Sequence, residues 1–263
     1  FIVNRDSDII DPILSAISEK TALAMIDTVS SPTGIRMPFE KLVEEIQKRG
    51  VDVLVDAAHG PGIVPLDLSK LNAAYITGNC HKWVCTPKGS AFLHIREDKR
   101  GGVKPLVIGH GYSSELPLNE KFRMEFDWTG TRDPSPWLCI PYAIGHLGSL
   151  VHGGWPEIMR RNHEMVIYGR DLLCEALGTS PPTPNSMVSS MSSIELPWDE
   201  DVVSVPPGGD PLHNLLFDNY KIQVPVIPWP NHNRKYIRIS AQLYNSKEEY
   251  EYLSNSLTSI LGL

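Results

Sequence analysis

Three short segments in the first third of the chain carry polar side chains that could do chemistry, and each follows an apolar run. They are Ser30–Gly34, Asp56–Gly62 and Thr77–Trp83. If the apolar runs are neighbouring parallel strands, the segments meet beyond the carboxyl ends of those strands, where open α/β sheets bind ligands. An aspartate, two histidines, a lysine and several hydroxyls would then share one crevice.

An aspartate and a lysine in such a crevice are the two groups that pyridoxal phosphate requires. The cofactor forms a Schiff base with a lysine amine, and an anion beside its pyridine nitrogen keeps the ring protonated, so that it can accept the electrons of a carbanion. Lys82 and Asp56 could supply these two groups. Hydrogen-bond donors such as Asn79 and His81 could hold the phosphate.

The elements that must position these segments alternate between strands and helices. Apolar runs predict four strands, at Ala22–Val29, Val51–Val55, Ala73–Thr77 and Ser90–Ile95. Helical signals lie between or before them: a helix opened by Asp11-Pro12, a helix from Pro38 to a stop at Gly50, and a short piece at Leu66–Leu71. This alternation predicts right-handed βαβ units, and therefore an α/β fold with a mainly parallel sheet flanked by helices.

The second half of the chain departs from this alternation, which is typical of a smaller α+β domain. The expected elements are an amphipathic helix at Trp155–Leu177, a loop running into a strand at Gly178–Ile194, strands at Ile222–Trp229 and Tyr236–Gln242, and a terminal helix at Lys247–Leu261. We place the domain boundary near Gly153.

The longest stretch without a charged residue runs from Pro134 to Pro156. It is long enough to span a membrane, but prolines and histidines interrupt it. We therefore predict a buried helix of the α/β domain here and no membrane segment.

The overall composition narrows the function classes. The 263 residues carry a formal net charge of −7, so no global field attracts nucleic acid. Four cysteines are too few for a disulfide framework, and no Cys or His spacing indicates a metal site, which favours a cytoplasmic protein. The chain opens on Phe1 without a methionine, so we expect it to begin in mid-protein.

Four motifs in order resemble the class V aminotransferase family of fold type I pyridoxal phosphate enzymes, and among these the isopenicillin N epimerase-like subgroup. They are Val53–His59, Thr77–Trp83, the Gly-Thr segment Phe126–Asp133 and the C-terminal arginine strand Tyr236–Asn245. The resemblance implies that residues 1–153 form the cofactor-binding large domain, with its N-terminal part missing. Residues 154–263 would form the small C-terminal domain.

The same resemblance implies roles for the residues around the cofactor ring. Lys82 would be the Schiff-base lysine and would carry the proton to and from the α-carbon of the substrate. Asp56 would pair with the pyridine nitrogen. His59 would donate to the phenolic oxygen of the cofactor, and Ser31 would lie near that oxygen.

Further residues would hold the phosphate and the substrate. Asn79 and His81 would contact the phosphate. Thr131 would reach the phosphate of the other subunit's cofactor, which implies a homodimer with shared active sites. Arg238 would bind the carboxylate of an amino-acid substrate in a bidentate pair.

The resemblance implies an enzyme that acts at the α-carbon of an amino acid, with an epimerase or racemase as the leading expectation. A carbon–sulfur lyase or an aminotransferase of the same family is the alternative. A desulfurase that forms a persulfide is not expected, because the segment 224–235 before Arg238 has no cysteine for that role.

Two readings from other classes stay open. The chain could be an inactive or truncated family member, which would bind the cofactor poorly. It could also be a metal-dependent hydrolase built on His59, His81 and Asp56, although the spacing of these residues does not support a metal site. Lys88, in the turn Thr86–Gly89, is the rival of Lys82 for the role of reactive lysine.

Overall fold

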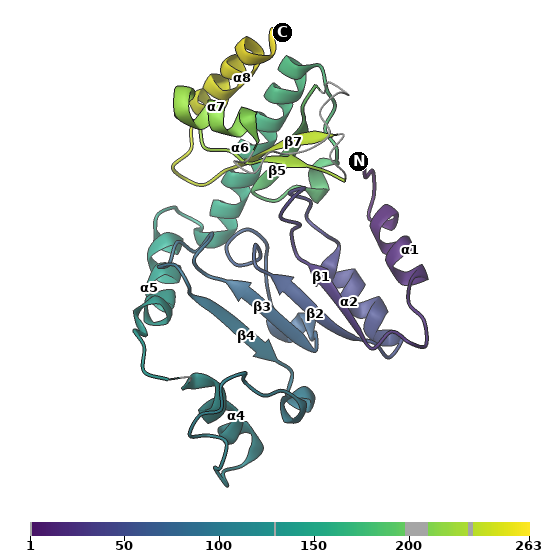
Figure 1. Cartoon of the computed structure of the whole chain (residues 1–263), viewed down its shortest axis with the longest axis vertical. Helices are drawn as coiled ribbons and strands as arrows, with labels where there is room; N and C mark the ends of the chain where they lie inside the picture. Colours follow the sequence, from purple (N-terminus) through teal and green to yellow (C-terminus); the bar gives the residue numbers. More distant parts are fainter. Residues whose placement is uncertain (1, 129, 198–209, 231–233) are drawn as a thin grey trace.

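The computed structural model describes residues 2–128, 130–197, 210–230 and 234–263, which form two β-sheets and the helices around them (Figure 1). The strands are β1 (Leu23–Asp27), β2 (Asp52–Ala57), β3 (Tyr75–Asn79), β4 (Ala91–Ile95), β5 (Met191–Glu195), β6 (Val226–Pro228) and β7 (Lys235–Ser240). The helices are α1 (Ser7–Ser15), α2 (Phe39–Lys48), α3 (Leu68–Leu71), α4 (Leu118–Asp127), α5 (Ser135–Ser149), α6 (Gly154–Leu177), α7 (Pro211–Tyr220) and α8 (Lys247–Leu261). Short 3₁₀ turns lie at Glu97–Gly102 and Asn185–Met187.

The first sheet has the order β1-β2-β3-β4, with parallel pairing from β1 to β3 and an antiparallel edge strand β4. The predicted α/β fold with a mainly parallel sheet flanked by helices is confirmed. The register aligns Asp27 of β1 with Asp56 of β2, and Asp56 with Thr77 of β3. Because directly aligned residues of neighbouring strands point to the same face, these three side chains lie side by side on one face of the sheet.

Helix α2 forms because its apolar residues recur at helical spacing and all face the first sheet. The predicted stripe is buried: Phe39, Leu42, Val43 and Ile46. They join one core cluster with Val53 and Val55 of β2. Burial of each such side chain contributes about 1.5–3 kcal/mol to folding. This packing fixes β2, and with it the position of the residues at its carboxyl end.

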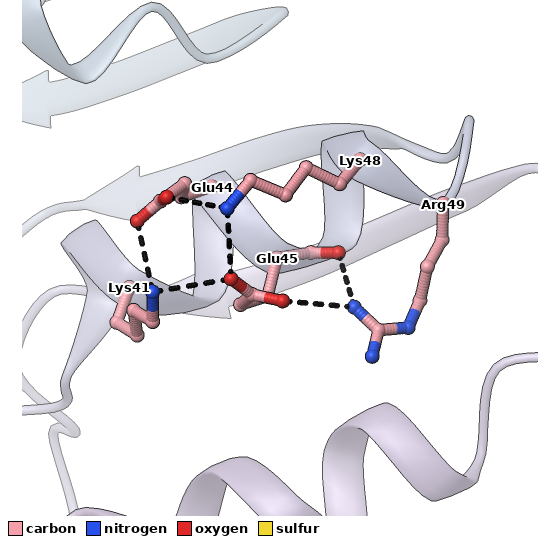
Figure 2. Close-up of polar contacts among 5 residues, drawn as sticks. All are labelled: Lys41, Glu44, Glu45, Lys48 and Arg49. Atoms are coloured by element: carbon pink, nitrogen blue, oxygen red, sulfur yellow. Dashed lines mark hydrogen bonds and ion pairs between the residues drawn. The ribbon is translucent and has the colours of Figure 1, made fainter.

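The outer face of α2 is stabilised by ion pairs between residues one helical turn apart (Figure 2). Lys41 and Lys48 each bridge Glu44 and Glu45, and Arg49 also reaches Glu45. Hydrogen bonds from Lys48, Lys41 and Arg49 lower the pKa of Glu45 to about 2. Exposed pairs of this kind are screened by solvent and contribute little each, so this network supports the helix and gives no sign of a binding site.

The second sheet has the order β5-β7-β6 and is entirely antiparallel. Helices α6 and α8 pack together on it, and their buried residues share a second core cluster with Ile237 and Ile239 of β7. Helix α8 begins at a capping box, in which the Ser246 side chain and the Glu249 side chain each accept from the other residue's backbone. Its bounds agree with those predicted from the sequence.

Gly169 allows α6 and α8 to approach closely. A Cβ atom on Gly169 would lie 2.6 Å from the ring of Tyr250, which is buried and anchored by a hydrogen bond from its hydroxyl to the Ser240 carbonyl. We expect Gly169→Ala to lower the free energy of unfolding by about 1–3 kcal/mol in urea denaturation, because the anchored ring cannot move aside. Gly145→Ala is the control: it lies in α5 with nothing near its added methyl group, so unchanged or higher stability is expected there. Equal effects of the two substitutions would contradict this account.

Three predictions about individual elements are wrong. Helix α1 begins at Ser7, before Asp11-Pro12; the Asp8 carboxylate in its first turn accepts from the Asn4 and Arg5 backbone N–H groups and so ties the preceding residues to the helix. The predicted strand Ile222–Trp229 is reduced to β6, since prolines without an N–H flank and end it.

The third wrong prediction concerns the uncharged segment. It forms α5, which has no buried residue; Leu138 and Tyr142 are more than two thirds exposed. Among the described residues, no helix combines the length and the apolar character needed to cross a membrane. Helices α4 and α7 were not predicted. The domain division near Gly153 stays a prediction.

Candidate active site

The carboxyl ends of the parallel strands bring most of the predicted site residues to one edge of the first sheet. Asp56 lies near the end of β2, and Asn79 ends β3. Both strands end on the side of the sheet that faces the second sheet (Figure 1). The loop after β1 contributes Ser31, and the turn after β3 contributes His81 and Lys82.

Lys82 lies against a histidine from the neighbouring strand end. The distance from its Nζ to the His59 Nε2 is 3.1 Å, and the Nδ1 of the same imidazole accepts a hydrogen bond from the Trp83 Nε1 at 3.2 Å. Burial lowers the pKa of Lys82, although Asp56 opposes the shift. Burial and the adjacent Lys82 lower the pKa of His59 to about 4. A lysine with a lowered pKa is the kind of amine that acts as a nucleophile or base near neutral pH.

Asp56 has a second carboxylate beside it, which the sequence reasoning missed. One Asp56 oxygen accepts from the Ala58 backbone N–H at 2.8 Å. Asp27, aligned with Asp56 on the same sheet face, has a pKa raised by burial and by the charge of Asp56. The sequence contained a signal for this pair, because each of two adjacent parallel strands has an Asp at or near its carboxyl end. The pair concentrates negative charge next to Lys82.

The proximity of the Asp27 and Asp56 carboxylates predicts how the stability of the fold depends on pH. A carboxyl whose pKa is raised by folding stabilises the fold when protonated, so this contribution is lost as the pH rises from the ordinary value of 3.8 through the raised value. Asp27→Asn should therefore raise the free energy of unfolding at pH 7 by a few tenths to about 1 kcal/mol, and the gain should fade below about pH 4. Urea denaturation at both pH values measures it.

The matched control for this prediction is Asp52→Asn. Asp52 begins the neighbouring strand β2 but has an opposite charge near it, with its carboxylate 2.6 Å from the Lys99 Nζ. Removal of that charge should leave stability unchanged or lower it. If both substitutions stabilise the protein equally at pH 7, repulsion between Asp27 and Asp56 is not the cause.

Arg238 of β7 reaches the same edge from the second sheet. One guanidinium nitrogen donates to the carbonyl and the hydroxyl of Ser31, and Ser193 of β5 donates to the Pro32 carbonyl at 3.2 Å. The Arg238 Nε is buried without a hydrogen-bond partner among the described residues, and burial lowers the pKa of Arg238. A buried N–H without a partner costs about 1–3 kcal/mol, so this guanidinium is suited to an anionic ligand.

A cavity of about 720 Å³ lies beside Arg238, between β7, α8 and the loop after α7. Among the predicted site residues it is lined by Arg238 alone. Lys82, Asp56 and His59 lie outside it, so the cavity by itself does not mark the place of the reactive groups. Their mutual contacts define the candidate site.

The two residues predicted to hold the phosphate are at the site but differ in their contacts. The Asn79 side chain makes no hydrogen bond among the described residues and is free to donate. The His81 Nδ1 lies 2.8 Å from the Ser90 carbonyl, to which it must donate. Only the doubly protonated imidazole of His81 could therefore also donate to a phosphate through Nε2.

Thr131 and Lys88 are not part of this cluster. Thr131 is exposed and lies between α4 and α5; α4 is at the end of the molecule opposite the second sheet (Figure 1). Lys88 is exposed in the turn before β4, and none of the described polar contacts joins it to Asp56 or His59. The geometry therefore favours Lys82 over Lys88 as the reactive lysine.

The residues present fit pyridoxal phosphate. A half-buried lysine amine lies beside an imidazole, carboxylates lie at or near the ends of two adjacent strands, and a buried guanidinium has an unused donor. These are the groups that an aldehyde, a pyridinium nitrogen and a substrate carboxylate require. Among the described residues, no cluster of three His, Cys, Asp or Glu side chains could hold a metal ion. All four cysteines are free.

Comparison with known proteins gives a consistent assignment. The family model described as aminotransferase class-V matches residues 3–182. The isopenicillin N epimerase of Amycolatopsis lactamdurans is 33% identical over 96% of this chain and 63% of its own length. A probable chloroplastic L-cysteine desulfhydrase of Arabidopsis thaliana is 32% identical over 92% of this chain and 51% of its own length.

A solved structure has the same fold. The apo cysteine desulfurase from Thermococcus onnurineus NA1 superimposes with a TM-score of 0.75 at 22% identity, covering 100% of this chain and 66% of that one. The chain thus spans between half and two thirds of the length of these proteins.

Proposed function

Since the chain belongs to the aminotransferase class-V family, whose enzymes use pyridoxal phosphate, we propose that the whole protein acts at the α-carbon of an amino acid through Lys82. The observation that carries this proposal is the contact of Lys82 with His59 beside the carboxylates of Asp56 and Asp27. It places a half-buried amine beside two carboxylates. A solvated structural lysine would have neither.

Each residue has a role that follows from its surroundings. When bound, pyridoxal phosphate supplies an aldehyde for the lysine and an electron-accepting ring. Lys82, held with a lowered pKa, carries a proton to and from the substrate α-carbon. Asp56 would hold the protonated ring nitrogen, and His59 would donate to the phenolic oxygen.

The remaining groups hold the ends of the ligands. Asn79 and His81 would hold the phosphate, and Ser31 would lie near the phenolic oxygen while it keeps Arg238 in place. Arg238 would bind the substrate carboxylate through donors that include its unpaired Nε.

The reaction that follows proton removal depends on where the proton and the electrons go next. Return of the proton to the opposite face of the α-carbon gives epimerisation, which we propose as the leading activity in view of the similarity to isopenicillin N epimerase. Loss of a sulfur leaving group from the β-carbon gives a carbon–sulfur lyase. The similarity to cysteine desulfhydrases favours this second candidate. Transamination by the same site is the remaining alternative.

A screen of amino acids against the intact protein loaded with pyridoxal phosphate separates these outcomes. Exchange of the α-proton with solvent deuterium, without release of ammonia, sulfide or keto acid, would support epimerisation. Release of sulfide and ammonia from cysteine would support the lyase. The absence of α-proton exchange from every amino acid would contradict action at the α-carbon.

We also propose a homodimer with shared sites. Thr131 lies between α4 and α5 and has no described contact with the Lys82 cluster. Large apolar side chains of the segment 106–128 are exposed: Leu106, Val107, Ile108, Tyr112 and Trp128. A surface of this kind favours burial against a second copy. Sedimentation of the intact protein as a monomer would contradict this. A cytoplasmic location stays an expectation, and one of the relatives is described as chloroplastic.

A further inference from the structure

The indole of Trp83 is the third member of a hydrogen-bonded chain that ends on Lys82. Its Nε1 lies 3.2 Å from the His59 Nδ1, and the His59 Nε2 lies 3.1 Å from the Lys82 Nζ. Trp83 and His59 are both buried. We propose that Trp83 is a positioning residue that keeps the amine of Lys82 uncharged, by fixing the tautomer of His59.

The donors and acceptors of Trp83, His59 and Lys82 allow only one arrangement of protons among the three side chains. An indole N–H can only donate, so the His59 Nδ1 must be the acceptor and carries no proton. A neutral imidazole then carries its proton on Nε2, which therefore donates to Lys82. An ammonium has three donors and no acceptor, so it cannot receive this bond. Only an uncharged Lys82 amine, with its lone pair, satisfies all three groups.

The alternative state, with an imidazolium at His59 and an ammonium at Lys82, is disfavoured by the surroundings of the two side chains. Burial and the positive charges of Lys82 and Arg238 oppose an imidazolium at His59. The charged groups that act on Lys82 come from three strands: Asp56 and Asp27 favour the ammonium, whereas burial and Arg238 oppose it. Two carboxylates thus pull the lysine toward its charged form. The hydrogen bond that the His59 Nε2 donates to Lys82 favours the uncharged amine instead.

The main chain and Cβ of Trp83 are held by contacts that do not involve the candidate site. The Gln242 side chain, beyond the end of β7, donates to the Trp83 carbonyl at 3.3 Å and accepts from the Asn162 amide of α6 at 2.9 Å. Gly62 also lies against the Trp83 side chain, since a Cβ at that glycine would come within 3.1 Å of the tryptophan Cβ. The main chain from which the indole extends is therefore anchored, and the Trp83 side chain is buried, before any ligand arrives.

The role of the Trp83–His59–Lys82 hydrogen bonds in the reaction rests on the proposed function. An uncharged amine is the form that attacks an aldehyde and accepts a proton. A proton on the His59 Nε2 is also what a hydrogen bond to the phenolic oxygen of the cofactor would need. The tautomer and the charge of Lys82 can be measured without cofactor, so the inference and the proposed function can fail separately.

The first measurement is the tautomer of His59 in the cofactor-free protein, from the ¹⁵N chemical shifts of its two ring nitrogens at pH 7. A protonated Nε2 and a bare Nδ1 are expected. A protonated Nδ1 would overturn the proposal, and this result needs no variant.

The second measurement is the pH profile of Lys82 labelling by a trace of acetic anhydride, read by peptide mass spectrometry with exposed Lys88 as the internal reference. In Trp83→Phe, the midpoint for Lys82 should rise by about one pH unit, because the His59 Nδ1 can then carry the proton and Nε2 can accept from the ammonium. Trp155→Phe is the matched control. It also removes an indole donor that packs against Gly62, but that donor bonds to the Ile144 carbonyl. A midpoint that moves equally in both variants, or in neither, would overturn the proposal.

Discussion

Replacement of Lys82 by alanine is expected to abolish the covalent attachment of pyridoxal phosphate and the activity with it. The amine has no substitute, because Lys88 is exposed and outside the cluster. Proton transfer by a positioned side chain alone is worth about 10²–10⁴-fold in rate, so kcat should fall by at least that much. Titration with the cofactor, followed by visible absorption, should show the band of the lysine-bound form in the wild type and its loss in Lys82→Ala.

Lys88→Ala is the matched control for this substitution. It removes a lysine from the next turn of the same segment and should leave both the absorption band and the turnover unchanged. A band that survives in Lys82→Ala and disappears in Lys88→Ala would show that the reactive lysine is wrongly assigned. Circular dichroism of each variant tests whether the fold is retained.

Replacement of Arg238 by glutamine is expected to weaken substrate binding and to leave the cofactor attached to Lys82. A charge-assisted hydrogen bond contributes about 1.5–3 kcal/mol, so loss of a bidentate pair costs about 3 kcal/mol or more. At 1.4 kcal/mol per factor of ten, kcat/KM for an amino acid should fall at least about a hundredfold. Steady-state kinetics measures this fall, and the same absorption titration tests the cofactor.

The matched control for Arg238→Gln is Arg234→Gln. Arg234 directly precedes the same strand but is exposed, in an ion pair of 3.4 Å with Glu195, so its loss should change kcat/KM little. An unchanged kcat/KM in Arg238→Gln would exclude this arginine from the carboxylate site. Loss of cofactor binding in that variant would instead indicate that the contact of Arg238 with Ser31 supports the cofactor pocket.

The convergence of Asp56, Asn79 and Lys82 could be predicted from the sequence because it depends on topology alone. Parallel strands joined by helices bring their carboxyl ends to one edge, whatever the side chains between them are. The α2 stripe and the α8 boundaries could be predicted for a similar reason, since both follow from local periodicity and capping.

The partners of individual side chains could not be predicted in this way. Trp83 follows Lys82 directly in the sequence, yet its partner His59 is 24 residues away on another strand end. Only the strand register, which aligns Asp27 with Asp56, shows that these two carboxylates lie together. Neither spacing nor composition specifies a register or the direction of an indole N–H.

Predictions from composition or from a single dipeptide were wrong where the burial or the start of a helix depends on its surroundings. The uncharged sequence of α5 indicated burial, but its apolar residues face outward in the single chain. An Asp-Pro dipeptide marks the start of α7, where Asp210 accepts from the Leu212 backbone. The same dipeptide lies inside α1, where the helix already begins at Ser7 and Asp8 bonds the backbone of Asn4. One dipeptide therefore marks a helix start in one place and a helix interior in the other.

The proposed function depends most on Lys82 being the lysine that bonds to pyridoxal phosphate. Borohydride reduction of the intact protein after incubation with pyridoxal phosphate, followed by peptide mass spectrometry, tests it most directly. We expect one stoichiometric pyridoxyl label, on the peptide that contains Lys82. A label on Lys88 or on any other lysine, or no stoichiometric label, would contradict it.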